Sequence, residues 1–436
     1  MSSLVVTVIG GGSSYTPELV AGLIRRHDTL PVTELRLVDI AEGQRKLEVI
    51  ASFARRMIAT AGIPMTVTAT LDRRRALEGA GFVVTQLRVG GLAAREKDET
   101  LPLRYDLVGQ ETTGAGGFAK ALRTVPVILD ICSDIEELCP RARLINFTNP
   151  SGLVTEAVLG RSAVSCIGLC NVPITMVRSI AEALHVDSSR LDCRFAGVNH
   201  LSFITSARLD GKDVLGDLLA SPGIVKEIFK DSPAADIDPS FVRGLGVIPS
   251  SYLQYYWCER AIVERDHDRV SSGRGTRARE VMAIEKDLFA RYADTSLTAP
   301  PPELMKRGGA YYSEVAVSLM GSVWNGTGDT HVVNTRNGDA VPDIPSESVV
   351  ETSCRVGSDG ATPLRHGPLP EGVRGLVQHA KTYERLTIEA AVSGSRETAL
   401  AALCANPLVR EPGIAERLLD DILTAHAPYL VRFTRG

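Results

Sequence analysis

The stretch Leu4-Val5-Val6-Thr7-Val8-Ile9, followed at once by Gly10-Gly11-Gly12-Ser13-Ser14, decides the fold class of this chain. An apolar, β-branched run that stops at glycines is typical of a buried strand ending in a tight turn. The next stretch, Pro17–Arg26, has a helical apolar period, with Thr16 as the expected N-cap and Pro17 in the first turn. The N-terminus is therefore predicted to be a strand, a glycine turn and a helix.

A glycine turn between a strand and a helix is a common binding site for a dinucleotide. Glycines let the backbone approach the pyrophosphate, which then lies on free N–H groups at the helix N-terminus. Tyr15 stands where the usual pattern has its third glycine, and a purely structural turn is the alternative. Asp39 ends the next expected strand, where a carboxylate would accept hydrogen bonds from a ribose and repel a 2′-phosphate, favouring NAD over NADP. The predicted NAD-binding residues are Gly10, Gly12, Ser13, Ser14 and Asp39.

Strand and helix patterns alternate through the first part of the chain. A helical pattern spans Glu42–Ala61. Five further runs have the composition of strands: Leu35–Asp39, Met65–Ala69, Phe82–Leu87, Leu144–Phe147 and Ser165–Leu169. Strands that alternate regularly with helices form a parallel, doubly wound sheet, which binds ligands beyond the carboxyl ends of its strands. We predict an α/β, Rossmann-like NAD-binding domain in residues 1–190.

The pattern becomes less regular beyond Asp192, and we assign residues 191–436 to a second domain. No flexible linker separates the two, so they are expected to share an interface. The expected elements are paired strands within Leu191–Arg208, a helix at Arg277–Ala293, a break at Pro300–Pro302, and helices at Val373–Ala402 and Ile414–Ala425.

The composition is that of an ordinary globular protein. Of 436 residues, 44% are hydrophobic and 23% charged, with a net charge of −4, which gives no reason to expect a nucleic acid or an anionic membrane as partner. No apolar run reaches the ~20 residues of a membrane span, and no basic segment precedes the first apolar run, so no signal peptide is expected. The eight cysteines lack CxxC or metal-finger spacing, which favours reduced thiols and a cytoplasmic location.

Polar residues follow three of the expected strands. The stretches are Asn146–Gly152, Gly168–Pro173 and Gly197–Leu201. Because the ends of parallel strands meet at one edge of a sheet, Cys170 and His200 are expected to come together. A thiolate and an imidazole would leave a divalent metal open positions for substrate. From these residues alone, a buried cysteine and a structural histidine are the alternative.

The same segments resemble glycoside hydrolase family 4, the NAD- and metal-dependent glycosidases. The matching segments are Gly10–Pro17, Arg88–Gly91 with Arg95, Gly109–Gly114, the Asn149 and Cys170 segments, Asn199-His200, Pro249–Tyr256, Arg307–Tyr312 and Tyr383–Thr387. The resemblance implies a C-terminal α+β domain similar to that of lactate and malate dehydrogenases. Residues 191–436 would then carry the substrate, metal and subunit contacts of a homodimer or homotetramer.

The resemblance also implies a reaction outside the two-carboxylate scheme of most glycosidases. In the family, NAD⁺ accepts a hydride from C3 of the sugar, and the resulting ketone acidifies the proton on C2. A tyrosinate removes that proton while a metal on the C2 and C3 oxygens stabilises the enediolate. The aglycone leaves, water adds and the ketone is reduced again, so NAD⁺ is not consumed.

Catalytic and metal-binding roles carry over to the positions that match the family pattern. Cys170 and His200 would hold the metal, usually Mn²⁺ in the family, although a thiolate by itself suits the softer Zn²⁺. Tyr252 would be the base, since a nearby metal cation favours the ionised phenol. Tyr255 and Tyr256 are the alternatives for that role.

Four further residues would bind the sugar. Asn149 would hydrogen-bond to it, and Asn171 follows the metal cysteine. Arg95 and Arg277 match positions that bind the 6-phosphate, which a guanidinium can hold through two hydrogen bonds; an exposed structural arginine is the alternative for each. Cys170-Asn171-Val172-Pro173 resembles the phospho-β-glucosidases, whereas phospho-α-glucosidases have an aspartate after the cysteine. Asn171 cannot donate a proton in that way, so the acid for the leaving group is unassigned.

The predicted activity is hydrolysis of a 6-phospho-β-glucoside such as cellobiose 6-phosphate. The alternatives within the family are 6-phospho-α-glucosidase and α-galactosidase. A lactate- or malate-type dehydrogenase would explain the glycine turn and Asp39, but it needs a catalytic histidine–aspartate pair and leaves Cys170 and His200 without a role. A catalytically inactive sensor of sugar phosphate or NAD is disfavoured by the complete set of candidate residues.

Overall fold

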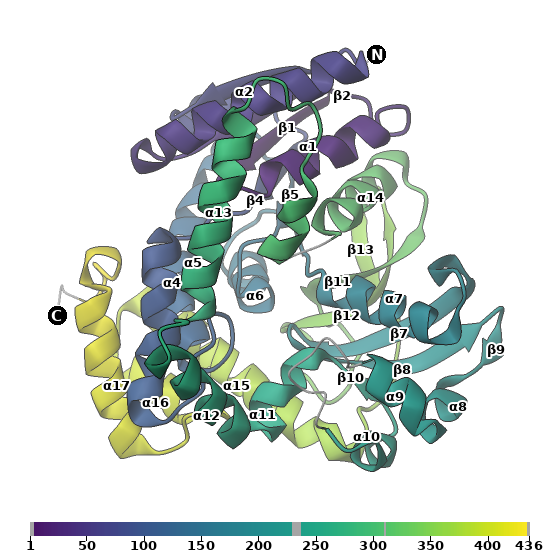
Figure 1. Ribbon diagram of the computed structural model, residues 1–436, viewed down its shortest axis with the longest axis vertical. Coiled ribbons are helices and arrows are strands. Elements are labelled where there is room, and N and C mark those ends of the chain that lie inside the picture. Colours follow the sequence, from purple (N-terminus) through teal and green to yellow (C-terminus); the bar gives the residue numbers. More distant parts are fainter. Residues whose placement is uncertain (1–3, 229–236, 309–310, 434–436) are drawn as a thin grey trace.

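The central feature of the fold is a nine-stranded sheet built outward from the N-terminal strand (Figure 1). The computed structural model describes residues 4–228, 237–308 and 311–433. Strand β1 (Leu4–Ile9) is buried along its whole length, because β2 (Val32–Val38) and β4 (Phe82–Thr85) flank it in parallel. The apolar run before the glycines is therefore a central strand, as the sequence predicts.

Six parallel strands follow the order β3-β2-β1-β4-β5-β6. The remaining three are β3 (Thr66–Thr70), β5 (Arg143–Asn146) and β6 (Cys166–Gly168). The winding reverses between β1 and β4, and ligands of doubly wound sheets bind at such a point, beyond the carboxyl ends of the strands. The predicted α/β, Rossmann-like fold is confirmed, and each expected strand ends within three residues of its expected bounds.

Three antiparallel strands from the second half of the chain complete the same sheet. They are β11 (Asp329–Arg336), β12 (Val349–Gly357) and β13 (Gly360–Pro363). Asn334 of β11 pairs with Gly168 of β6 and so joins the antiparallel part to the parallel part. Strands from both sides of residue 190 therefore share one layer.

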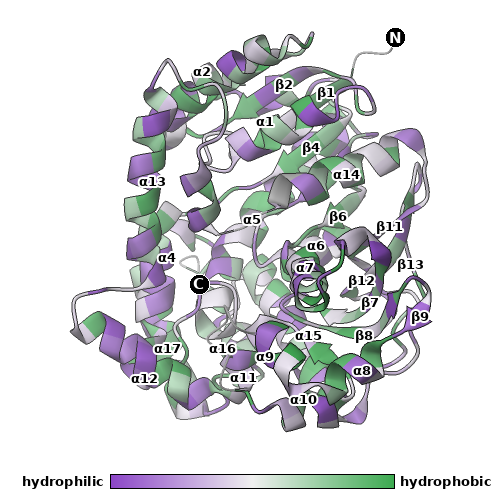
Figure 2. Ribbon diagram, turned by 45° about the vertical axis from the view of Figure 1, so that its right-hand side comes forward, coloured by the Kyte–Doolittle hydropathy of each residue, from purple (hydrophilic) through white to green (hydrophobic). Residues whose placement is uncertain are grey.

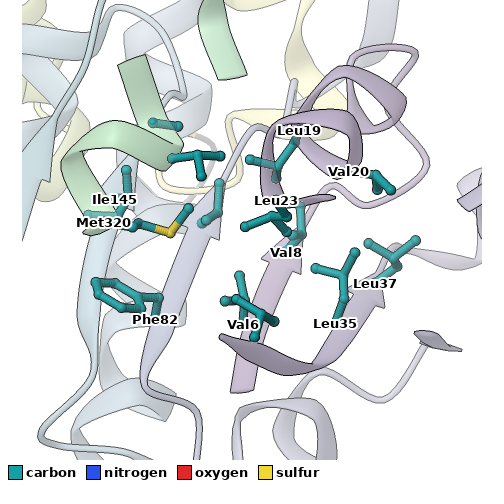
Figure 3. Packing of buried hydrophobic residues seen from close by; sticks show 14 of the residues in the cluster. Val6, Val8, Leu19, Val20, Leu23, Leu35, Leu37, Phe82, Ile145 and Met320 are labelled. Atoms are coloured by element: carbon teal, nitrogen blue, oxygen red, sulfur yellow. The ribbon is translucent and has the colours of Figure 1, made fainter. Parts of the chain in front are cut away.

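Helices cover both faces of the sheet. On one face, Leu23 of the first helix lies against Val8, and Met320 lies beside Ile145 (Figure 3). The helices of this face are α1 (Thr16–Arg25), α2 (Gln44–Ala61), α13 (Arg277–Ala293) and α14 (Tyr312–Asn325). The opposite face is covered by α5 (Gly114–Leu138) and α6 (Ser151–Arg161).

A second, smaller sheet packs beside the antiparallel end of the first. Strands β7 (Leu191–Val198) and β8 (Leu201–Leu209) are antiparallel, which confirms the expected pair of strands. The short strands β9 (Lys212–Asp213) and β10 (Ile248–Pro249) pair with β8. The backbone N–H of Phe195 in β7 donates to the hydroxyl of Ser353 in β12 at 3.0 Å, so the two sheets are hydrogen-bonded as well as packed.

The C-terminal helices pack on α5. They are α15 (Glu371–Ser393), α16 (Arg396–Cys404) and α17 (Pro412–Ala425). The expectation of one helix over Val373–Ala402 is wrong, because Gly394 takes a left-handed φ of +72° and Ser395 starts a new helix by accepting the N–H of Thr398 at 3.1 Å.

The expected N-cap of α1 is also wrong. Thr16 is the first helical residue, and its hydroxyl donates to the carbonyl of Gly11 at 2.8 Å instead of capping the helix. Tyr15 occupies the N-cap position. The hydroxyl of Thr16 thus fastens the glycine turn to the helix that follows it.

The other helices are α3 (Arg73–Leu77), α4 (Gly91–Thr100), α7 (Val172–Leu184), α8 (Leu215–Ala220), α9 (Pro222–Ile228), α10 (Pro239–Leu245), α11 (Gln254–Trp257) and α12 (Glu259–Ser271). In Figure 2 the strands β1 and β4 are mainly hydrophobic, whereas α13 mixes hydrophobic and hydrophilic residues, as a helix with one buried side does. Within the described residues, no helix is both long and apolar enough to span a bilayer.

Candidate active site

The glycine turn between β1 and α1 is tightly enclosed by the neighbouring strands. Gly10 has a φ of +89°, and a Cβ there would come within 3.0 Å of the backbone of Gln86. A Cβ on Gly12 would lie 2.7 Å from Oδ2 of Asp39, which already accepts the N–H of Gly12 at 2.8 Å. Only glycine fits these positions, so the turn offers bare backbone at the switch point of the sheet.

The turn, the start of α1 and Asp39 together suit NAD. The N–H groups of Gly10 to Ser13 are bonded within the turn or to Val38 and Asp39, so the N–H of Ser14 is the one that the turn can offer to a pyrophosphate, and Asp39 supplies a carboxylate for a ribose. Ser13 is half-buried, and its hydroxyl accepts the N–H of Tyr15 at 3.3 Å. Ser14 is fully buried and turned towards α13, where its hydroxyl contacts Glu285 at 3.1 Å. The side chain of Ser14 therefore binds protein, and its carbonyl accepts the hydroxyl of Tyr292 at 3.0 Å, which leaves its backbone N–H for a cofactor.

Tyr252 and His200 stack on each other. Their ring centroids are 3.8 Å apart and their planes differ by 12°. His200 lies in the hairpin turn between β7 and β8 with a φ of +65°, and its Nδ1 is 3.1 Å from the hydroxyl of Thr112. Tyr255 meets Tyr252 edge-on at 5.6 Å between centroids. The structure thus brings the expected base and one expected metal ligand into contact.

Burial keeps the acidic and basic groups of this cluster neutral. It raises the pKa of Tyr252, an effect to which Tyr255 and Cys170 add and which a hydrogen bond from Thr112 opposes. Burial and then Glu351 raise the pKa of the Cys170 thiol to about 12. Burial, helped by Lys120, lowers the pKa of His200 to about 3. A cation bound here would reverse the first two shifts, since it favours thiolate and phenolate.

Cys170 and His200 form a donor set that fits a divalent metal. The thiol follows β6 at the start of α7, is 7% exposed, and acts on the pKa of Tyr252, against which His200 stacks. Neutral imidazole and a thiol that a metal can ionise are both good ligands. In the described ranges no three His, Cys, Asp or Glu side chains are grouped to hold a metal. Two protein ligands leave coordination positions for substrate oxygens.

A buried carboxylate that was not predicted as a site residue is hydrogen-bonded to the residue before His200. Glu351 of β12 is fully buried and accepts hydrogen bonds from Asn199 at 2.8 Å and Ser202 at 2.6 Å. Asn199 precedes His200, and its side chain also hydrogen-bonds to Cys170. The signal in the sequence was one acidic residue inside an apolar strand.

Asn149 and Asn171 lie at the starts of α6 and α7, on the loops that follow β5 and β6. Asn149 donates to the carbonyl of Phe147 at 3.3 Å, while its Oδ1 is buried and has no hydrogen-bond partner. A buried acceptor of this kind is satisfied by a ligand hydroxyl. Asn171 is half-buried at the N-cap of α7, directly after Cys170.

Arg95 is buried in a cluster of charges beside Tyr252. Its guanidinium binds Glu99 at 2.7 Å and Glu111 at 2.9 Å. Burial lowers the pKa of Arg95, but the two carboxylates outweigh it and the net shift is upward. Glu111 also binds Arg88 and, at 2.9 Å, Lys120.

Arg277 lies at the edge of the same region but does not contact Arg95. It pairs with Glu280 and donates to the carbonyl of Lys306 at 2.9 Å. A Cβ on Gly308 would be 3.8 Å from both Arg277 Nη2 and the hydroxyl of Tyr15, so Arg277 is near the glycine turn. Gly309 and Ala310, which belong to the segment Arg307–Tyr312 that resembles the family, lie outside the described residues.

The described residues contain two histidine–aspartate pairs. His267 and Asp106, 2.9 Å apart, form an exposed pair between α12 and the turn that follows Tyr105, whereas the other pair is closed to a substrate. His426 lies 3.2 Å from Asp98, but both side chains are 0% exposed. Arg123 holds both oxygens of Asp98 at 2.8 and 2.7 Å. This pair anchors the end of α17 to α4 and α5.

A Rossmann-like sheet with a cysteine, a histidine and a half-buried tyrosine at one edge defines an unusual class of NAD-dependent enzyme. Comparison with known proteins gives the family: the model described as "Family 4 glycosyl hydrolase" matches residues 5–186, and that of its C-terminal domain matches residues 195–409. The chain belongs to glycosyl hydrolase family 4.

Two relatives are similar along the whole chain. A probable 6-phospho-β-glucosidase of Bacillus subtilis is 48% identical over 99% of this chain and 98% of its own length. The structure of the 6-phospho-β-glucosidase of Thermotoga maritima with manganese, NAD⁺ and glucose 6-phosphate is 36% identical, covers 98% of this chain and 99% of that one, and has a TM-score of 0.89. The resemblance to family 4 is thus confirmed.

The expected likeness to lactate and malate dehydrogenases holds at the level of the fold. A lactate dehydrogenase from a deep-sea metagenome library is 15% identical, covers 90% of this chain and all of that one, and has a TM-score of 0.56. The two share an α/β architecture.

Proposed function

We propose that this chain hydrolyses 6-phospho-β-glucosides, such as cellobiose 6-phosphate, with NAD and a divalent metal, Mn²⁺ by similarity. The observation that carries the proposal is the contact of Tyr252 with His200, beside Cys170 and Arg95. A base, two metal donors and a phosphate-binding cation then lie at the sheet edge that also holds the glycine turn.

Bound NAD⁺ would supply the hydride acceptor, and a bound divalent metal would stabilise negative charge on the sugar oxygens. Tyr252 accepts the C2 proton on its phenolate oxygen, and Thr112 supports that phenolate by a hydrogen bond. Asn149 offers its unpaired Oδ1 to a sugar hydroxyl. Tyr252 is half-buried, and its contacts with His200 and Tyr255 fix the orientation of its ring.

Phosphate recognition is assigned to Arg95, with Arg277 at the edge of the crevice. Arg95 is buried and faces Glu111, which holds its guanidinium in a fixed position. Asn171 stands where the α-specific members have an acid, which favours the β-anomer. Residues 191–436 would carry substrate, metal and subunit contacts, with His200 as their metal ligand. Residues 1–190 would carry the NAD site and the other ligand, Cys170. We propose a homodimer or homotetramer in the cytoplasm.

The test is release of nitrophenol from p-nitrophenyl β-glucoside 6-phosphate, with and without NAD⁺, Mn²⁺ and a thiol reductant. Release that needs both cofactors, with no net absorbance change at 340 nm and none from the unphosphorylated glucoside, is the expected result. Equal cleavage of the α-anomer would leave the elimination chemistry standing and would contradict only the assignment to the β-specific subgroup. Absence of release together with NADH formation from a hydroxy acid would refute the hydrolase.

A further inference from the structure

An arginine without a counter-ion is buried at the start of α1. Arg307 ends the short turn Pro302–Arg307 and is 8% exposed. Its guanidinium lies over the ring of Tyr15, with 5.0 Å from Cζ to the ring centroid. Its Nε is buried and has no hydrogen-bond partner, and no hydrogen bond of its guanidinium is found within residues 4–228, 237–308 and 311–433. Buried guanidinium groups are ordinarily paired.

The nearest carboxylate does not satisfy Arg307. Glu285 is 3.9 Å away, beyond hydrogen-bond distance. Its two oxygens are already engaged, one with Lys46 at 2.6 Å and the other with the hydroxyl of Ser14 at 3.1 Å. A positive charge therefore stays uncompensated beside the glycine turn.

The neighbouring cations add to this excess. Burial lowers the pKa of Arg307, and Arg88 and Arg95 lower it further, whereas Tyr15 and Glu285 oppose the shift. Burial and Arg88 likewise lower the pKa of Lys120 to about 7, although Glu111 opposes the shift. The cations of this region outnumber the carboxylates near them by two. They are Lys46, Arg88, Arg95, Lys120 and Arg307 against Glu99, Glu111 and Glu285. An anion with two negative charges would balance the set.

We propose that Arg307 binds a phosphoryl group at the N-terminus of α1, next to Tyr15. Two features point to that ligand: the unpaired Nε of a buried guanidinium and the local excess of cations. The phosphoryl group belongs to the 6-phosphate of the sugar or to the pyrophosphate of NAD. The inference rests on the proposed function for both ligands.

The experiment measures binding without turnover. Dissociation constants of glucose 6-phosphate and of NAD⁺ are determined separately by calorimetry for wild type, Arg307→Met, Arg307→Lys and Arg291→Met. Methionine keeps an apolar stem on the Tyr15 ring and removes the charge. Arg291 is a half-exposed arginine on α13 paired with Glu303, so Arg291→Met is the matched control for lost charge.

Arg307→Met is expected to weaken one of the two ligands about ten- to hundred-fold, the usual range for losing a charge-assisted hydrogen bond, while Arg307→Lys recovers part of the loss. The ligand whose affinity falls is the one whose phosphoryl group Arg307 binds. Inorganic phosphate should raise the Tm of wild type and not that of Arg307→Met. Unchanged affinity for both ligands in a folded Arg307→Met, or in Arg307→Lys if the first variant does not fold, would overturn the inference. Wild type that binds neither ligand would instead overturn the proposed function.

Discussion

Replacing Glu351 with glutamine should weaken metal binding much more than folding. In the native protein the carboxylate accepts Asn199 at 2.8 Å, Ser202 at 2.6 Å and Asn334 at 3.3 Å. A glutamine in that place can still accept from the two asparagines through Oε1 and donate to the hydroxyl of Ser202. Two short charge-assisted bonds become neutral, at about 1 kcal/mol each, and removal of a buried charge offsets part of that loss. We expect the free energy of unfolding to fall by less than about 2 kcal/mol.

The metal should respond more strongly. Asn199 links Glu351 to Cys170. Loss of the carboxylate therefore removes a negative charge near the metal ligands and the group that orients Asn199 beside Cys170 and His200. Changes of this kind in partners of metal ligands typically weaken metal binding about 10- to 100-fold. The dissociation constant for Mn²⁺ is measured by electron paramagnetic resonance under reducing conditions, and stability by urea unfolding of the metal-free protein.

The control is Glu156→Gln, which changes another buried carboxylate, one that binds Lys381 at 2.6 Å. It should leave Mn²⁺ affinity unchanged. Glu351→Gln that is folded and binds Mn²⁺ within two-fold of wild type would refute a positioning role. If both variants lose affinity equally, the effect is general loosening rather than support of Cys170.

Three further outcomes are expected. Tyr252→Phe should lower kcat about 10²- to 10⁴-fold, because a proton acceptor is lost, without changing the dissociation constant for glucose 6-phosphate. An equal fall in kcat for Tyr255→Phe would contradict the assignment of Tyr252 as the base. Asp98→Ala should lower the free energy of unfolding in urea by about 3–5 kcal/mol, since Arg123 is left charged and fully buried. The control Asp210→Asn, at an exposed ion pair, should lower it by less than about 1 kcal/mol. Similar losses in the two variants would contradict the importance of burial. Burial, helped by Arg194, lowers the pKa of His366 to about 4. The unfolded chain therefore binds a proton that the fold does not, and stability should fall by about 1–2 kcal/mol between pH 6.5 and pH 4, after discounting for partial exposure. His366→Gln should flatten that part of the curve, and an unaltered slope would show that His366 does not contribute.

Local patterns predicted the strands, the glycine turn and the paired strands that carry His200. These features depend on neighbouring residues. Strand ends of a parallel sheet meet by topology, so Cys170 and His200 could be expected to lie near one another. The break at Gly394 was missed because the apolar period continues across it, although a glycine before a serine is a stop and a new N-cap.

What the sequence did not predict depends on contacts between distant segments. Glu351 lies 152 positions from Asn199, and no local pattern announces that their side chains meet. Arg307 looked like one more residue of a matched segment, and its isolation became visible only when its surroundings were known. Arg277 matched a phosphate-binding position, but its structural partners are Glu280 and Lys306, so its role stays a prediction.

The antiparallel extension of the main sheet has a consequence for biosynthesis. The partner of Gly168 on β6 is Asn334, which the ribosome adds 166 residues later. At about 5–20 residues per second, the outer edge of β6 stays unpaired for roughly 8 to 30 s after it emerges. An open edge can pair with another nascent chain. The parallel half of this enzyme is thus most exposed to misassembly during translation, before strand β11 arrives to close it.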